Sequence, residues 1–369
     1  MFLSLQLMRE DFLHKKLEER KTQNAYRQLK LTEGMVDFCS NDYLGLSRLL
    51  QPESSSGDSG RHGSTGSRLL AGNYPLINET EELIAAFHAA PAALIFNSGY
   101  DANIGLLSSV PQRGDTILYD YLSHASIRDG IRLSFAESFS FPHNNLDELE
   151  EKLKKATGNK FVVTESVFSM DGDMAPLTEM IAICEKHGAH LIVDEAHATG
   201  VIGKNGEGLV QELNLESRCF ARIHTFGKAL GCHGAAVLGS SDLRNYLINF
   251  SRAFIYTTAL PESSVKTIRM SYELFPQMHT EREKLRKLVA EFQQSPIKFN
   301  KQKSDTPIQA VIVPGNKEVK YVAGQLQAMQ FDIRPILYPT VPTNSERLRI
   351  VLHAFNTTEQ VRSVTGSLQ

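Results

Sequence analysis

The sequence is poor in cysteine, in long apolar runs and in excess charge, and each shortage excludes a class of protein. Its 369 residues include four cysteines without Cys-x-x-Cys spacing, so we expect reduced thiols in a cytoplasmic protein and no metal site. No apolar run reaches the roughly 18 residues that cross a bilayer, and the apolar start is too short for a convincing signal peptide. The 39 basic and 42 acidic residues form no basic stripe. We therefore expect no membrane partner and no nucleic-acid partner.

The sequence does contain an alternation of apolar runs and helical patterns. Six apolar runs have the length of buried strands: 92–96, 116–119, 161–164, 190–193, 221–225 and 235–238. Helical patterns at 146–156 and 176–187 lie between some of them. This alternation predicts an α/β fold with a mostly parallel central sheet covered by helices. Ligands of such sheets bind beyond the carboxyl ends of the strands. Candidate residues at those ends are Asn97, Asp120, Glu165, Asp194 and Thr225.

We expect three parts along the chain. Residues 1–40 contain an amphipathic helix at 8–30 and a short strand at 35–39. Residues 41–297 form a large ligand-binding domain, in which the Ser- and Gly-rich segment 53–60 is expected to be a mobile loop.

A long helical region at residues 261–294 should connect this domain to the next one. Residues 298–369 then form a smaller α/β domain. Its predicted strands are 308–313, 331–333 and 348–352.

Lys228 and Asp194 are the most informative pair. Lys228 lies in the small-residue stretch His224–Gly231, and Asp194 ends the apolar run Leu191–Val193. A lysine in such a turn can form a Schiff base, and an acid at the end of a buried strand can hold a pyridinium nitrogen protonated. These are the two protein groups that pyridoxal 5′-phosphate (PLP) requires.

Two other interpretations compete with a PLP site. The stretch Asp194–His197 spells the box of a helicase family, but that family also needs a Gly-x-x-x-x-Gly-Lys-Ser/Thr loop. Here Lys204 is followed by Asn and Lys228 by Ala, so the loop is missing. Alternatively, Lys228 is a solvated loop lysine and Asp194 a strand cap. Each residue alone favours that reading, whereas the pair favours the cofactor.

The turn after the first apolar run is a candidate phosphate site. Ser98, Gly99 and Tyr100 begin a helical stretch there, and the N-terminus of a helix binds phosphate. Gly99 would allow close approach of the backbone. The hydroxyl of Thr225, three residues before Lys228, could face the same phosphate. Without the other motifs, the turn is equally an ordinary strand-to-helix connection.

Three further side chains could complete the site. His124 could stack on a pyridine ring, and His197 could reach the phenolic oxygen of the cofactor. Arg349 alternates with apolar residues and could clamp a substrate carboxylate. The competing interpretations are polar or capping histidines and a solvated arginine.

Seven motifs in order resemble the α-oxoamine synthases, which are PLP enzymes of fold type I, the aspartate-aminotransferase-like fold. The resemblance covers nearly the whole chain. The motifs are Ser40–Leu46, Gly63–Leu70, Asn97–Tyr100, Ser123–Ile127, Val193–Gly200, His224–Gly231 and Arg347–Arg349.

The resemblance implies a role for each residue around the cofactor ring. Lys228 would bind PLP covalently, and Asp194 would pair with the pyridinium nitrogen. His197 would bond the phenolic oxygen, with Ser166 nearby. His124 would stack on the ring.

The resemblance also implies a phosphate site, a substrate site and a homodimer with shared active sites. Phosphate would be bound by Ser98, Gly99, Tyr100 and Thr225 and, from the neighbouring subunit, by Thr257 and Thr258. The substrates would be bound by Arg20, Asn41, Thr340 and Arg349.

The implied reaction is a decarboxylative condensation of L-alanine with a pimeloyl thioester, carried by coenzyme A or by an acyl carrier protein, in biotin biosynthesis. Glycine acetyltransferase, 5-aminolevulinate synthase and serine palmitoyltransferase share nearly every motif and remain alternatives. A catalytically silent PLP-fold binding protein is disfavoured by the intact pair of Lys228 and Asp194.

Overall fold

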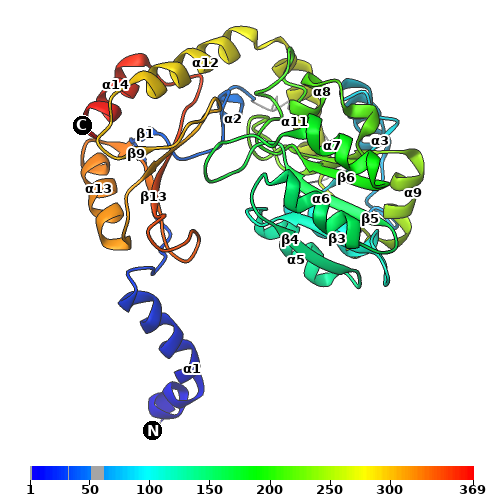
Figure 1. The fold of residues 1–369 in the computed structure, drawn as a ribbon, viewed down its shortest axis with the longest axis horizontal. Helices are drawn as coiled ribbons and strands as arrows, with labels where there is room; N and C mark the ends of the chain where they lie inside the picture. Colours follow the sequence, from blue (N-terminus) through cyan, green and yellow to red (C-terminus); the bar gives the residue numbers. More distant parts are fainter. Residues whose placement is uncertain (1, 32, 51–61) are drawn as a thin grey trace.

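The computed structural model describes residues 2–31, 33–50 and 62–369. The predicted loop at residues 53–60 lies outside the described residues. Figure 1 shows two lobes, a large one drawn mainly in cyan and green and a small one drawn in orange and red.

The large lobe is built on a seven-stranded sheet of order β2-β8-β7-β6-β5-β3-β4. Its strands are β2 (Ala92–Phe96), β3 (Thr116–Asp120), β4 (Glu137–Phe141), β5 (Lys160–Glu165), β6 (Ala189–Asp194), β7 (Ala221–Thr225) and β8 (Ala235–Gly239). Strand β8 runs antiparallel to both of its neighbours, and the other four pairs are parallel. The predicted α/β fold with a mostly parallel sheet is confirmed.

Strand β4 was not among the predicted strands. Four of its five residues are exposed, and only Phe141 is buried. Because β4 is an edge strand, it lacks the continuous apolar run that marks a strand buried on both faces.

Alternate side chains of the sheet enter two separate cores, as the two-residue period of a strand requires. Val162 and Val193 pack into one core, and Val163 and Ile192 into the other. The first face is covered by α3 (Pro75–Phe87), α6 (Leu146–Lys155), α7 (Leu177–Lys186), α8 (Leu209–Glu212) and α11 (Glu262–Leu274). The second face is covered by α4 (Gly99–Ser109), α5 (Ala125–Leu133), α9 (Ser241–Phe250) and α10 (Arg252–Ile255).

The predicted helical region at residues 261–294 is two helices rather than one. Helix α11 ends at Leu274, a 3₁₀ turn follows at Phe275–Gln277, and α12 spans His279–Gln294. Pro276 lies in that turn. Proline has no N–H to donate and its ring clashes with the preceding turn of a helix, which accounts for the break.

The small lobe carries a four-stranded antiparallel sheet of order β12-β13-β10-β9. Its strands are β9 (Asn300–Lys301), β10 (Ile308–Ile312), β12 (Arg334–Ile336) and β13 (Arg347–Val351), and its helices are α13 (Asn316–Ala328) and α14 (Thr358–Gly366). A separate parallel pair joins β1 (Val36–Asp37) to β11 (Phe331–Asp332). The N-terminal strand is thus part of the small lobe.

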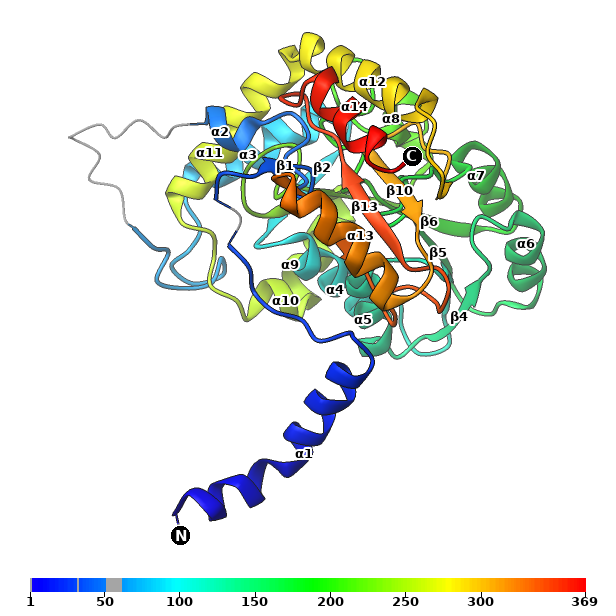
Figure 2. The ribbon, with the colours of Figure 1, turned by 90° about the vertical axis from the view of Figure 1, so that its left-hand side faces the viewer.

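The N-terminal helix begins and ends earlier in the chain than the predicted span of 8–30. Helix α1 covers Phe2–Thr22 and projects away from both lobes (Figures 1 and 2). Asn24 has a positive φ of 53°, a left-handed conformation that cannot continue a right-handed helix. The chain then runs to the small lobe, where α2 (Leu46–Leu49) follows β1.

Candidate active site

The predicted cofactor groups meet at the carboxyl ends of β5, β6 and β7. Glu165 and Asp194 end β5 and β6 and are partners in the parallel register. Thr225 ends β7, and Lys228 lies in the turn that follows. Since parallel strands bring their carboxyl ends to one edge, residues far apart in the sequence converge there.

Asp194 is held as an acceptor by two N–H donors. It is 5% exposed. Its Oδ2 accepts from Asn103 Nδ2 at 2.7 Å, and its Oδ1 accepts from the backbone N–H of Ala196 at 2.9 Å. Hydrogen bonds to the ionised form stabilise a buried carboxylate. Asn103, on α4, was not predicted; its only sequence signal is a polar amide in a mostly apolar helical stretch.

Lys228 contacts a neutral histidine. Its Nζ lies 2.8 Å from His197 Nε2, and His197 Nδ1 lies 2.6 Å from the hydroxyl of Tyr43. Burial lowers the pKa of Lys228 to about 8 and holds the pKa of His197 well below its ordinary value. Burial also raises the pKa of Tyr43 to about 12, so the phenol keeps its proton. Tyr43, inside the matched motif Ser40–Leu46, was not singled out from the sequence.

Arg349 and Asn41 lie together, as the resemblance implied. Arg349 Nη2 donates to Asn41 Oδ1 at 2.9 Å, and its Nε donates to the backbone carbonyl of Ser169 at 2.7 Å. Asn41 Oδ1 also accepts from the hydroxyl of Tyr43 at 3.2 Å. Arg349 is therefore connected to His197 and Lys228 through hydrogen bonds.

Two neighbouring arginines are engaged elsewhere. Arg347 is largely buried and forms an ion pair with Asp171. Arg334 forms an ion pair with Asp332. Arg349, with an amide and a carbonyl as partners, is the arginine of β12 and β13 that an incoming carboxylate can recruit.

His124 precedes α5 and is fixed at both its backbone and its ring. Its backbone N–H donates to Glu165 Oε1 at 2.6 Å. Its ring Nδ1 lies 2.8 Å from the hydroxyl of Ser126 and accepts from the Ser126 N–H at 3.2 Å. The ring itself is exposed. A fixed, exposed imidazole suits stacking on a planar ligand.

The predicted phosphate residues cluster at the start of α4. Ser98 caps the helix by accepting from the N–H of Asp101 at 3.0 Å. A Cβ added to Gly99 would lie only 3.2 Å from Thr225 Oγ1, so these two residues are in close contact. Tyr100 is partly exposed and donates to Asp129 at 2.6 Å.

Asn97 connects this cluster to the segment after α10. Its Nδ2 donates to Thr257 Oγ1 at 2.9 Å and to the backbone carbonyl of Thr258 at 2.7 Å. The side chain of Thr258 is exposed. Asn97 thus fixes the segment that carries both threonines.

Similarity to known proteins identifies the family. The model of class I and II aminotransferases matches residues 33–368. A relative in Emericella nidulans, named 8-amino-7-oxononanoate synthase, is 43% identical over 95% of this chain and 93% of its own. The chain belongs to the class I and II aminotransferase family, in its α-oxoamine synthase branch.

Solved structures agree with this placement. A serine palmitoyltransferase from S. paucimobilis with bound PLP superposes with a TM-score of 0.87 at 28% identity, covering 98% of this chain and 97% of that one. An 8-amino-7-oxononanoate synthase from Francisella tularensis gives a TM-score of 0.75 at 28% identity, covering 91% and 97%. This α-oxoamine synthase is a PLP-dependent acyltransferase with the predicted aspartate-aminotransferase-like fold.

The residues of this α-oxoamine synthase fit PLP. Among the described residues, none accepts from the N–H groups of Gly99 and Tyr100 at the start of α4, and free N–H groups at a helix N-terminus bind phosphate. Asp194 offers an anion for a pyridinium nitrogen. Lys228 offers an amine of lowered pKa for the aldehyde.

The structure places Ser166 beside the backbone of Asp194 and places Arg20 away from the site residues. Ser166 is fully buried, and its hydroxyl donates to the backbone carbonyl of Asp194 at 3.3 Å. Ser169, three residues later, lines the cleft instead. Arg20 is exposed on α1, which projects from the body (Figure 2). Both residues had been named through the resemblance alone, and neither has a periodic signal that fixes its position.

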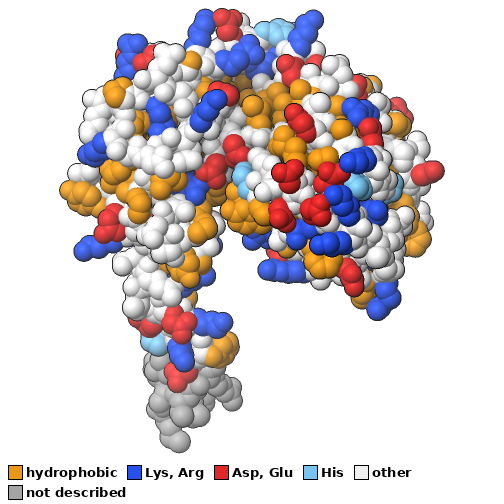
Figure 3. Space-filling view, viewed as in Figure 1, with side chains coloured by type: hydrophobic (Ala, Val, Ile, Leu, Met, Phe, Trp, Pro, Cys, Tyr) orange, Lys and Arg blue, Asp and Glu red, His pale blue; other side chains and the backbone are white. Residues whose placement is uncertain are grey.

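A cavity of about 570 Å³ opens beside His124. Thr340 lines it together with Arg27, whose Nη2 donates to the Thr340 hydroxyl at 2.9 Å. Ser169 and Arg128 also line it. Figure 3 shows the surface hollowed between the lobe of α13 and the lobe of α5. Arg27, rather than Arg20, is therefore the arginine that contacts Thr340.

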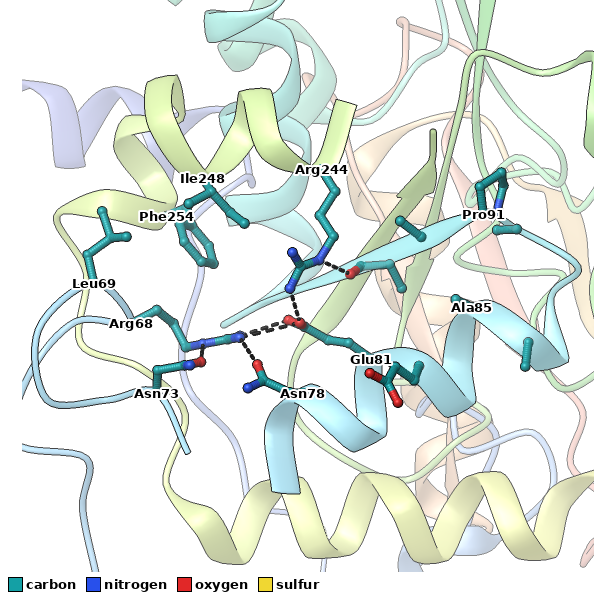
Figure 4. A pocket seen from close by; sticks show the side chains of 15 residues that line it. Arg68, Leu69, Asn73, Asn78, Glu81, Ala85, Pro91, Arg244, Ile248 and Phe254 are labelled. Carbon is teal, nitrogen blue, oxygen red and sulfur yellow. Dashed lines mark hydrogen bonds and ion pairs between the residues drawn. The ribbon is translucent and has the colours of Figure 1, made fainter. Parts of the chain in front are cut away.

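A larger cavity of about 800 Å³ lies between α3 and α9 (Figure 4). Arg68 and Arg244 both bind the buried carboxylate of Glu81, at 2.8 and 3.0 Å. Arg68 also donates to Asn73 and Asn78. These polar groups satisfy one another, and the cavity contains no amine–acid pair suited to catalysis.

Within the described part of the chain, no helix has the length and apolarity to cross a membrane. The same residues contain no group of three or more His, Cys, Asp and Glu side chains that could hold a metal ion.

Proposed function

We propose that this acyltransferase condenses L-alanine with a pimeloyl thioester, giving 8-amino-7-oxononanoate, carbon dioxide and the free thiol. The observation that carries the proposal is the hydrogen-bonded path from Lys228 to Arg349. It runs through His197, Tyr43 and Asn41, with steps of 2.8, 2.6, 3.2 and 2.9 Å. An α-amino acid needs a reactive amine at one end of its site and a carboxylate clamp at the other.

Lys228 would remove the proton from the substrate Cα. Its pKa of about 8 leaves a substantial neutral fraction near neutral pH, and a base is most effective when its pKa lies near the working pH. His197 is neutral, so it can share a hydrogen with Nζ without repelling it.

Asp194 would pair with the ring nitrogen of the cofactor, and His124 would stack on the ring. PLP, when bound, supplies the electron sink that makes the Cα proton acidic. Asp194 would keep the ring nitrogen protonated, which Asn103 supports by orienting Oδ2. His124 would stack on the ring, and Ser98, Gly99, Tyr100 and Thr225 would bind the phosphate.

Arg349 would bind the alanine carboxylate. Its guanidinium group presents two parallel N–H donors, which match the two oxygens of a carboxylate. The present partners are an amide oxygen and a carbonyl oxygen. A carboxylate is a stronger acceptor than either, so substrate can displace or join them.

Arg27 and Thr340 would receive the far carboxylate of the pimeloyl chain. A dicarboxylic acyl chain needs a cationic or hydroxyl-lined end to its pocket. Arg27 donates to Thr340 in the cavity beside His124, and Arg27 has no carboxylate partner among the described residues. The donor would be the coenzyme A or carrier-protein thioester.

A homodimer with shared active sites is part of the proposal. Leu70 and Tyr256 are large apolar side chains with 84% and 73% of their surface exposed. Tyr256 immediately precedes Thr257 and Thr258, which would approach the phosphate of the partner subunit. We also propose a cytoplasmic location, consistent with four cysteines that are all free thiols.

Serine palmitoyltransferase is the second candidate. It is favoured by the higher TM-score of 0.87 against 0.75. Both structures are 28% identical to this chain, whereas the biotin-pathway relative is 43% identical over almost the full length. Sequence similarity therefore favours alanine and a pimeloyl donor.

A substrate panel tests the proposal. Pimeloyl, acetyl and palmitoyl thioesters are each incubated with alanine, glycine or serine, and the products are assigned by mass, with Lys228→Ala enzyme as the blank. We expect alanine with the pimeloyl thioester to give the highest rate. A higher rate with palmitoyl-CoA and serine, or with acetyl-CoA and glycine, would replace the proposed substrates while leaving the site residues in place.

A further inference from the structure

Glu165 is a buried carboxyl group for which the proposed reaction has no role. It ends β5, is 3% exposed, and is the register partner of Asp194 on β6. Two carboxyl groups on adjacent buried strands repel each other if both are ionised. Such an arrangement lowers the stability of the fold, and a role for Glu165 in the site would explain its presence there.

Its contact is with the backbone of His124. Glu165 Oε1 accepts from the His124 N–H at 2.6 Å. This N–H belongs to the residue just before α5, and a buried backbone N–H without an acceptor is destabilising. The carboxyl group thus fixes the peptide from which the His124 ring projects.

The hydrogen bond between Glu165 and His124 belongs to a larger network that also includes Ser126, Asn103 and Asp194. The ring of His124 is held by Ser126, whose hydroxyl accepts from Asn103 Nδ2 at 3.0 Å. The same Nδ2 donates to Asp194 Oδ2 at 2.7 Å. Asp194 is in turn the register partner of Glu165 in the parallel pairing of β5 with β6. The stacking histidine and the acid for the ring nitrogen are therefore positioned by one framework.

We propose that Glu165 is a positioning residue, which sets the place of the His124 ring by accepting the hydrogen bond from its backbone N–H. The inference rests on the proposed stacking role of His124. Holding the His124 N–H requires an acceptor oxygen on the side chain of residue 165, and it does not require a negative charge.

The surroundings of Glu165 support the neutral form. Burial and the neighbouring Asp194 raise its pKa to about 8. Asp120, at the end of β3, acts in the same direction, whereas Lys228 and the His124 N–H oppose it. A neutral Glu165 places no second negative charge beside Asp194, whose proposed role is toward a pyridinium nitrogen.

The test compares Glu165→Gln with Glu165→Ala in the PLP-loaded enzyme. Glutamine keeps a carbonyl acceptor without a charge, and alanine removes the acceptor. The readouts are the induced circular dichroism of bound PLP in its visible band and the kcat/KM for L-alanine. We expect Glu165→Ala to lose much of the dichroism and about 10- to 100-fold in kcat/KM, and Glu165→Gln to stay within about threefold of the wild type.

A double-mutant cycle with His124→Ala separates positioning from general damage. If Glu165 acts through His124, adding Glu165→Ala to His124→Ala should have little further effect. Glu195→Ala is the matched control. It removes another fully buried carboxyl group beside Asp194, bonded instead to the Val210 N–H, and should leave the dichroism per bound PLP unchanged.

Three results would overturn the inference. They are additive effects of the two alanine variants, a Glu165→Gln variant as damaged as Glu165→Ala, and unchanged dichroism in Glu165→Ala. If His124→Ala itself leaves the dichroism unchanged, the stacking role and this inference fail together. Should Glu165→Ala not fold, Glu165→Met preserves the volume without the acceptor and takes its place.

Discussion

The ion cluster of Glu81 and the site of Lys228 differ in how their charges are satisfied. In the cavity of about 800 Å³, Arg68 and Arg244 share the carboxylate of Glu81. In the cleft region, Lys228 has no carboxylate within ion-pair distance among the described residues, and its partner is the neutral His197. The larger cavity is therefore a structural ion cluster, and unpaired charge rather than volume identifies the chemistry.

The two sites also make opposite contributions to stability. A buried ion cluster with complete hydrogen bonds is strongly weakened when one partner is removed. A buried amine of lowered pKa, such as Lys228, is maintained by the surrounding fold at a cost to stability, as is usual where function requires it. Substitutions in one site should alter folding, and substitutions in the other should alter turnover.

The largest expected effect is the loss of turnover in Lys228→Ala. The change removes both the covalent attachment point of PLP and the proposed base, while the free energy of unfolding of the apoenzyme stays near that of the wild type. Product mass and denaturant unfolding are measured on the same preparation, with exposed Lys204→Ala as the control. Substantial turnover without PLP attached to another lysine would refute the assignment.

The next largest effect is the opposite one, a loss of stability with turnover retained. Glu81→Gln leaves two arginines without their shared carboxylate, and we expect the free energy of unfolding to fall by about 3–5 kcal/mol. Turnover per folded, PLP-loaded molecule should remain near that of the wild type. Urea unfolding with a parallel activity titration checks both. A folded Glu81→Gln enzyme without turnover would show that the α3–α9 cavity belongs to the active site.

Arg349→Lys should have a smaller effect, on alanine binding alone. Lysine keeps the charge but loses the paired donors, and losing one charged hydrogen bond costs about 1.5–3 kcal/mol, roughly one to two decades in the alanine dissociation constant. Spectral titration of the PLP enzyme with alanine measures it, and Arg334→Lys is the control. An unchanged dissociation constant would place the clamp elsewhere.

The features of the fold that depend on a local sequence pattern were predictable from the sequence. The buried strands β5 and β6 contain continuous apolar runs, so their carboxyl ends and the position of Asp194 followed directly. Edge strand β4 has no such run. Pro276 was visible, but the helical pattern on both sides of it obscured the break.

The contacts within the site were not predictable in this way. Tyr43 and His197 are 154 residues apart, and Asn103 and Asp194 are 91 apart. No periodicity links such pairs, because they meet only when the strands and α4 pack together. The position of Ser169, which lines the cleft, was not predictable for the same reason, since residues after a strand end have no period that fixes which side chain enters the cleft.

The last prediction uses pH to separate two buried glutamates of the same strand edge. Burial, with Asp194 adding to the effect, raises the pKa of Glu165 from its ordinary 4.5 to about 8, and burial raises that of Glu195 to about 7. A group whose pKa is raised on folding binds more protons in the folded state. Its contribution to stability is therefore complete below pH 4.5 and is lost as pH rises through the folded-state value.

Relative to Glu165→Gln, wild-type apoenzyme should lose up to about 1.4 kcal/mol of unfolding free energy per pH unit across this window. Relative to Glu195→Gln, the loss should end near pH 7. Between pH 7 and 8, Glu165→Gln should flatten the pH dependence more than Glu195→Gln, because of these two glutamates only Glu165 still titrates there. Equal slopes for both variants in that interval would mean that the register contact with Asp194 does not distinguish Glu165 from an ordinary buried acid.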